Sequence, residues 1–133
     1  MKDAFSYWLP LCEMVSQLRC WVRVTSRVNT LTQEGYWGQL LTMPVEGYLE
    51  GPGGPIPLQD VEWVDVSTRL IKGGIAGRSL QLIDVKDEIF SALRGTQLDW
   101  ELHESIWSKE GIFDEQPVQV FRIANPFGPQ SNP

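Results

Sequence analysis

Apolar and polar residues alternate in several short segments of this chain, and this alternation limits the folds that it can adopt. In the clearest segment, 61–66, every second side chain would point to the same side of an extended strand. Segments 20–28, 78–85 and 118–123 alternate in the same way, and most connections have hairpin length. Because no strand–helix–strand rhythm appears, the pattern predicts an antiparallel sheet.

The acidic segment 98–106 has two interpretations. Its apolar residues Leu98, Trp100 and Leu102 are spaced by two, with acidic residues and a histidine between them, which predicts a strand with one charged face. A helix over 99–109 is the alternative.

Two other segments have apolar residues at helical spacing. In the first, Pro10 suits the first turn and the apolar residues that follow predict a helix over 10–19. In the second, Asp84 is expected to cap a helix over 86–94 that ends before Gly95. The chain is therefore expected to have an α+β fold, with an antiparallel sheet packed against two short helices. The expected core consists of apolar residues from both helices and the strands: Leu18, Val22, Val24, Trp63, Leu82, Phe90, Leu93 and Val120.

Glycine and proline divide the chain into segments. Residues 50–57 hold three of each, which predicts a long exposed loop, because proline donates no hydrogen bond to a strand ladder. A polar turn is expected over 29–35, and a strand over 36–43. With 133 residues, of which 42% are hydrophobic, the chain can form one core. We expect a single domain over 1–124 and a disordered tail over 125–133.

The residues that most often carry catalysis or bind metals are scarce. The sequence has one histidine, His103, and two cysteines, Cys12 and Cys20, without metal-site spacing or a third group to orient a Cys–His pair. We therefore expect no enzyme activity, no metal and no cofactor, and buried, reduced cysteines. The basic, glycine-rich segment 72–79 has neither of the common phosphate-binding spacings, so a wide turn is the simpler interpretation.

The acidic residues lie mainly in the last part of the chain. The formal net charge is −6, and residues 79–133 hold nine acidic and four basic residues. Such a protein has no general attraction for nucleic-acid phosphate or anionic lipid. With no secretion signal or membrane span in the sequence, we expect a cytoplasmic protein.

An acidic surface either is simply solvated or attracts a basic protein partner, which an exposed tryptophan would anchor. We expect the second case, with these partner-binding residues: Glu101, Glu104, Trp107, Glu110, Asp114 and Glu115.

The strand pattern of segment 61–66, with an early helix before it and a helix and closing strands after it, resembles small immunity proteins of bacterial toxin–immunity systems. The Gly/Pro-rich segment 51–57 departs from that pattern. The resemblance implies that the partner is a cognate toxin domain, for instance a nuclease. Two alternatives stay open, namely a phage- or plasmid-encoded inhibitor that mimics nucleic acid, and a small ligand-binding protein or enzyme that uses segment 72–79. The oligomeric state does not follow from the sequence.

Overall fold

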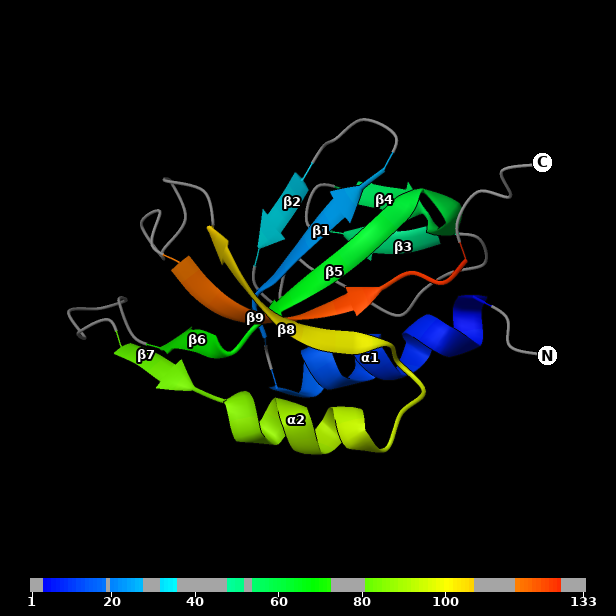
Figure 1. Ribbon diagram of the computed structural model, residues 1–133. Helices are drawn as coiled ribbons and strands as arrows, with labels where there is room; N and C mark the ends of the chain where they lie inside the picture. Colours follow the sequence, from blue (N-terminus) through cyan, green and yellow to red (C-terminus); the bar gives the residue numbers. More distant parts are fainter. Residues whose placement is uncertain are drawn as a thin grey trace.

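The computed structural model describes residues 4–18, 20–27, 32–35, 48–51, 54–72, 81–106 and 117–127 (Figure 1). Its helices are α1 (Ala4–Leu18) and α2 (Lys86–Arg94), and a 3₁₀ turn spans Leu58–Asp60. Its strands, in chain order, are β1 (Val22–Ser26), β2 (Thr32–Gly35), β3 (Tyr48–Gly51), β4 (Gly54–Pro57), β5 (Val61–Ser67), β6 (Arg69–Lys72), β7 (Gln81–Asp84), β8 (Trp100–Ile106) and β9 (Pro117–Ala124).

The main sheet has the strand order β2-β1-β5-β9-β8, and all its described pairings are antiparallel. Two smaller hairpins, β3–β4 and β6–β7, accompany it. Both helices lie along one side of the main sheet (Figure 1). This arrangement confirms the predicted α+β fold, an antiparallel sheet packed against two helices, and it confirms the strand interpretation of segment 98–106.

One face of the main sheet forms the core together with the helices. Val22, Val66 and Phe121 succeed one another across β1, β5 and β9, and all three are fully buried. The neighbouring row, Val24, Val64 and Ile123, is buried as completely. The helices contribute buried side chains to the same cluster: Trp8, Leu11, Val15, Ile89 and Leu93.

Helix α1 begins earlier than the sequence predicts, so Pro10 lies inside it rather than in its first turn. An interior proline costs about 3 kcal/mol. The extension buries Trp8 completely, three residues before Leu11 on the same face. Burying about 200 Å² of indole stabilises the fold by about 5 kcal/mol, which outweighs the cost of the proline.

Helix α2 has the predicted bounds, but the residues that flank it do not play the predicted roles. The N-cap residue is Val85 rather than Asp84, and the Asp84 Oδ1 atom accepts a hydrogen bond of 2.8 Å from the Lys86 N–H. The predicted N-cap at Asp84 is therefore wrong, although Asp84 still satisfies one free N–H group of the first turn. At the other end, Gly95 has a φ of −90°, so it does not adopt the left-handed conformation that favours glycine.

Two predicted loop regions contain strands. The expected Gly/Pro loop is wrong, because β3 and β4 form an antiparallel hairpin in which the buried residues Leu49 and Ile56 face each other. Pro55 and Pro57 are tolerated because they lie two residues apart, on one side of a two-stranded ladder. The expected turn over 29–35 is also wrong at its end, where β2 pairs with β1. The strand expected over 36–43 lies outside the described residues.

Most of the expected core residues are buried, with two exceptions. Val22, Val24, Leu93 and Val120 are buried, and Leu18 packs against the core. Phe90 is 41% exposed, because it lies at the margin of the core, where its ring meets the partly buried Trp100 edge-on. Trp63 is only partly buried, because it lies on the opposite face of β5 from Val64. The side chain of Leu82 is not described.

The first residues of the expected C-terminal tail contact the domain. The Asn125 Nδ2 group donates hydrogen bonds to the carbonyl oxygens of Leu58 (2.8 Å) and Val61 (2.7 Å). The ring of Phe127 packs edge-on against Tyr7, with 5.6 Å between ring centroids. These contacts place residues 125–127 against the 3₁₀ turn and α1. Within the described parts of the chain, neither helix has the length and apolar character needed to cross a membrane.

Candidate functional site

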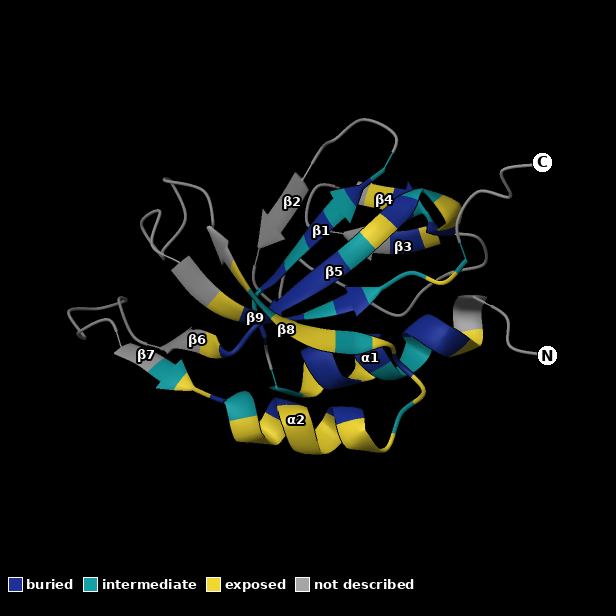
Figure 2. Ribbon diagram, viewed as in Figure 1, coloured by how far each residue is buried: buried dark blue, intermediate teal, exposed yellow. Residues whose placement is uncertain are grey.

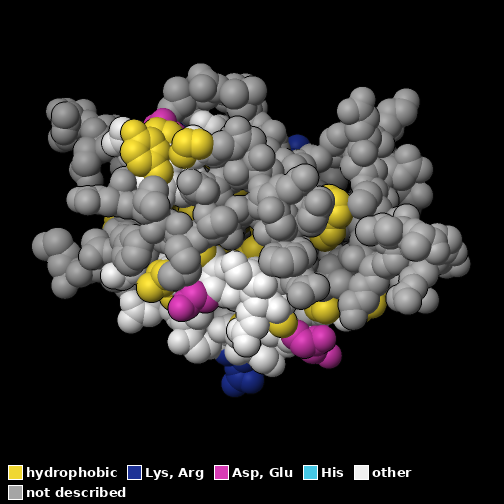
Figure 3. All heavy atoms as spheres, turned by 180° about the vertical axis from the view of Figure 1, so that it is seen from behind, with side chains coloured by type: hydrophobic (Ala, Val, Ile, Leu, Met, Phe, Trp, Pro, Cys, Tyr) yellow, Lys and Arg dark blue, Asp and Glu magenta, His cyan; other side chains and the backbone are white. Residues whose placement is uncertain are grey.

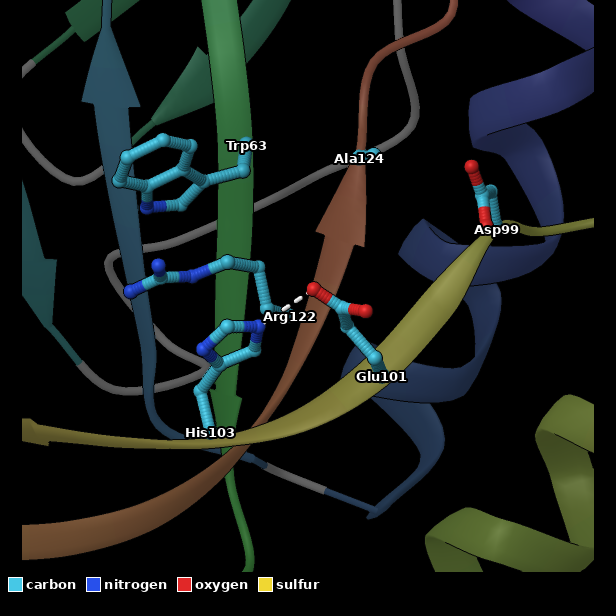
Figure 4. Close-up of a pocket in the computed structure, with 6 residues that line it drawn as sticks. All are labelled: Trp63, Asp99, Glu101, His103, Arg122 and Ala124. Carbon is cyan, nitrogen blue, oxygen red and sulfur yellow. Dashed lines mark hydrogen bonds and ion pairs between the residues drawn. The ribbon is translucent and has the colours of Figure 1, made fainter.

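A cleft of about 280 Å³ lies on the sheet face that points away from the helices. Three neighbouring strands, β5, β9 and β8, supply most of its walls (Figure 4). The residues that line it are Trp63, Asp99, Glu101, His103, Arg122 and Ala124. We call this cleft the β8 cleft.

Charges of alternating sign cross the sheet on the same face. The register places Arg23 of β1 opposite Asp65 of β5, Asp65 opposite Arg122 of β9, and Arg122 opposite Glu101 of β8. Cross-strand neighbours on one face are close enough to interact, and opposite charges in such positions stabilise a sheet. The row ends at β8 with a negative charge.

Asp65 and Arg122 form the central ion pair of this row. Arg122 donates two hydrogen bonds to the carboxylate, from Nε to Oδ1 (2.8 Å) and from Nη2 to Oδ2 (3.1 Å). The Asp65 side chain is 1% exposed and that of Arg122 is 23% exposed. The Arg122 Cζ atom also lies 4.1 Å from the centroid of the Trp63 ring. The guanidinium group is thus held in place, with its charge offset by a buried carboxylate.

Glu101 and His103 lie two residues apart on the same face of β8, and their side chains meet (Figure 4). The distance from His103 Nε2 to Glu101 Oε1 is 2.6 Å. The Glu101 side chain is 73% exposed, so it stays accessible to a partner. A His–carboxylate pair can act in acid–base catalysis only next to a reacting group. In the described lining of the β8 cleft there is no serine, threonine, cysteine or lysine that could serve as a nucleophile.

Tyr7 of α1 positions one end of the β8 cleft. Its hydroxyl group donates a hydrogen bond to the Ala124 carbonyl oxygen (2.6 Å) and accepts one from the Asp99 N–H (2.9 Å). Burial is the main cause that raises the pKa of Tyr7 above its ordinary value. The hydroxyl therefore stays protonated and joins the helix to the adjacent ends of β8 and β9.

The structure describes two of the six expected partner-binding residues, Glu101 and Glu104, and both are exposed. They are three residues apart on a strand, so their side chains point to opposite faces of the sheet rather than to one acidic face. The other four lie outside the described residues: Trp107, Glu110, Asp114 and Glu115. Figure 2 shows exposed residues along β8 and on the outer side of α2.

Apolar side chains are exposed beside these acids. Leu102 is 43% exposed between Glu101 and Glu104, and Phe90 of α2 is 41% exposed. The Phe90 ring meets Trp100 edge-on, with 5.5 Å between centroids. We call the exposed residues around this strand the β8 surface: Phe90, Asp99, Glu101, Leu102 and Glu104. On the opposite side of the molecule, the described acidic side chains are scattered (Figure 3).

Sequence reasoning missed several residues of the β8 cleft. Asp65 of β5 forms its described ion pair with Arg122, because β5 pairs with β9. The alternation of segment 118–123 places Arg122 on the polar face of its strand, yet the identity of the neighbouring strand is not visible in that pattern.

The cysteines are unsuited to nucleophilic chemistry. Both are buried and free, and burial raises the pKa of Cys12 and of Cys20 to about 12. Thiols with such a pKa stay protonated near neutral pH and are poor nucleophiles. Within the described part of the chain, no three His, Cys, Asp or Glu side chains gather in a way that could hold a metal ion.

Comparisons with protein-family models, with curated proteins and with solved structures gave no match for this chain.

Proposed function

We propose that this chain binds a basic protein partner through the β8 surface and blocks the partner's action, as an immunity protein does with a cognate toxin domain. The observation that carries the proposal is the character of β8. It lies at one end of the sheet and exposes Glu101 and Glu104 on its two faces, with the exposed Leu102 between them. A partner that reached this strand would meet negative charge on both sides of an apolar contact.

This composition suits protein recognition. Protein interfaces combine a desolvated apolar centre with a polar rim, and a few large side chains carry most of the binding free energy. Phe90 and Leu102 supply exposed apolar area, and Asp99, Glu101 and Glu104 supply a negative rim. Rim charges act mainly on the association rate, because they attract the partner before contact.

The β8 cleft supports binding better than catalysis. Among its described lining residues, the guanidinium group of Arg122 is neutralised by Asp65 and packed on Trp63, so it is poorly suited to capture an anionic substrate. A nucleic-acid mimic would carry its carboxylates in a row along one face, whereas Glu101 and Glu104 point to opposite faces. The glycine-rich segment 72–79, which could support a ligand-binding function, lies outside the described residues except for Lys72.

The test uses the protein encoded directly upstream of this chain's gene, because toxin and immunity genes are expected to be neighbours. Production of that protein alone should arrest growth, and this chain should restore it. With purified proteins, the double variant Glu101→Lys/Glu104→Lys should slow association at least tenfold, an effect of about 1.4 kcal/mol on the barrier.

The matched control is Glu13→Lys/Glu62→Lys, which changes the net charge equally at two exposed acids of α1 and β5. This control should associate almost as fast as the unchanged chain. Equal slowing by both double variants would mean that only net charge matters, and it would contradict a binding site at β8. Absence of binding between the two purified proteins would contradict the proposed function itself, for this candidate toxin.

A further inference from the structure

Strand β8 has one free edge in the described part of the fold. It is the last strand of the order β2-β1-β5-β9-β8, and its described partner is β9. Among the described residues, backbone hydrogen bonds of 100–106 to any element other than β9 are absent. Such an edge presents a row of N–H and C=O groups that can pair with another extended chain.

The charged row of the sheet specifies what could pair with this edge. Across β1, β5, β9 and β8 the row reads Arg23, Asp65, Arg122 and Glu101, with alternating sign. A strand added beside β8 would continue the row at the position opposite Glu101. Opposite charges at directly facing positions are stabilising, so the continuation favours a lysine or an arginine.

The apolar face specifies the neighbouring positions. Val24, Val64, Ile123 and Trp100 succeed one another in register, and the next row ends in Leu102. Trp100 is partly buried against Phe90 and Phe121, and Leu102 is exposed. Residues of an added strand that face Trp100 and Leu102 would lie on this apolar side, where β-branched residues would cover Leu102 and Phe90.

We propose that the basic partner binds by adding an extended segment to the free edge of β8, with a lysine or arginine opposite Glu101 and apolar residues opposite Trp100 and Leu102. This inference rests on the proposed function and specifies how the partner binds. Main-chain hydrogen bonds would supply affinity, and the alternating side chains would supply specificity.

A second copy of this chain is a less suitable occupant of the same edge. Residues 99–106 hold three acidic residues, Asp99, Glu101 and Glu104, and no lysine or arginine. Pairing of β8 with itself would bring two such segments side by side, and like charges in neighbouring strands are destabilising.

The probe is a synthetic seven-residue peptide, acetyl-Thr-Thr-Val-Lys-Val-Thr-Thr-amide, added to the full chain. Binding is followed by NMR shifts and by hydrogen exchange of the backbone amides of 100–106. We expect the peptide to slow exchange at alternate amides of β8 by at least about tenfold. The matched peptide with glutamate in place of lysine should bind at least about tenfold more weakly.

N-methylated peptides separate strand addition from simple charge attraction. Successive N–H groups of a strand point to opposite edges, so only alternate peptide N–H groups can face β8. One peptide is methylated at the lysine nitrogen and another at both valine nitrogens. If a strand is added, one of the two loses binding and the other keeps it. Equal binding by both methylated peptides would overturn the proposal.

Four other outcomes are equally decisive. No protection of β8 up to the solubility limit of the peptide would overturn strand addition, and so would equal binding of the lysine and glutamate peptides. Protection of β8 that rises with protein concentration in the absence of peptide would identify a second copy as the occupant. One outcome separates the two proposals. If Glu101→Lys/Glu104→Lys slows association with the candidate toxin, but the β8 amides of the unchanged chain stay unprotected in its complex with that toxin, the proposed function stands and strand addition is wrong.

Discussion

Removal of the Arg122 side chain should be among the most destabilising single changes on the polar face of the sheet. In Arg122→Met, the Asp65 carboxylate would lose both hydrogen bonds while it is 1% exposed. Removing one member of a buried ion pair costs about 3–5 kcal/mol, because the remaining charge loses its hydrogen-bonding partner. Loss of the contact with Trp63 adds about 0.5–1 kcal/mol.

Removal of the Asp65 charge should lower the free energy of unfolding less than removal of the Arg122 side chain, because the two partners differ in exposure. In Asp65→Asn, the Arg122 guanidinium group, already 23% exposed, can be solvated more readily than the carboxylate could. We therefore expect a loss of about 1–2 kcal/mol in the free energy of unfolding. This is the cost of a weakened hydrogen bond to a charged group that can still be hydrated. The double variant Asp65→Asn/Arg122→Met should be more stable than Arg122→Met alone, because the buried group is then neutral.

Urea denaturation followed by far-UV circular dichroism measures these differences. With a mid-range slope of about 2 kcal/mol per molar urea, Arg122→Met should lower the midpoint by about 2–3 M. Arg122→Lys is the control, since it keeps the charge but lacks the planar two-bond geometry, and it should fall between the native chain and Arg122→Met. A loss below about 1 kcal/mol for Arg122→Met, or no recovery in the double variant, would refute this reasoning.

Three further predictions concern the parts that support the β8 cleft. Tyr7→Phe removes the hydroxyl that the Asp99 N–H and the Ala124 carbonyl share as a hydrogen-bonding partner. The free energy of unfolding in urea should therefore fall by about 1–3 kcal/mol. An unchanged midpoint would show that water replaces the hydroxyl. Burial raises the pKa of Cys12 and Cys20 from 9.0 to about 12, so between these pH values the thiols ionise in the unfolded chain but stay protonated in the folded one. Their contribution to the free energy of unfolding is therefore complete below pH 9 and is lost as the pH rises toward 12. Each thiol should lower the free energy of unfolding by about 1.4 kcal/mol per pH unit in that range, and a Cys12→Ala/Cys20→Ala variant with the same alkaline slope would contradict this. Gly95→Ala should be neutral or should stabilise the chain by about 0.4–1 kcal/mol in thermal unfolding, because φ is −90° and an added Cβ meets no atom within 4 Å; a clear loss would show that the glycine is required there.

The fold class was predictable because strands with one buried face have a visible period of two. Val22 and Val24, Val64 and Val66, and Phe121 and Ile123 each occupy alternate positions, so their strands could be read from the sequence. The β3–β4 hairpin was not predictable in this way, because Gly and Pro dominate its composition. Its two strands are held by the buried pair Leu49 and Ile56, whose contact depends on the tertiary fold.

The candidate site was less predictable than the fold. The sequence predicts that Glu101 lies on the charged face of a strand, but it does not show that Arg122 pairs with Asp65, because the two are 57 residues apart. Trp63 illustrates the same limit. Alternation places it opposite Val64, and only the pairing with β9 brings the Arg122 guanidinium group over its ring. Local periodicity reports which side a residue faces, whereas strand order decides what it meets there.

The position of β9 has a consequence for the route by which the chain folds. The last described strand, β9, lies inside the sheet between β5 and β8, and the Tyr7 hydroxyl donates a hydrogen bond to the Ala124 carbonyl oxygen, 117 positions away in the chain. A ribosome-bound chain that lacks β9 would hold β5 and β8 without their shared neighbour, so the sheet cannot close until β9 has been synthesised. Contacts between positions so distant in the chain slow the search for the native state. We therefore expect the sheet to form only after β9 has left the ribosome, with α1 among the last elements to reach its final position.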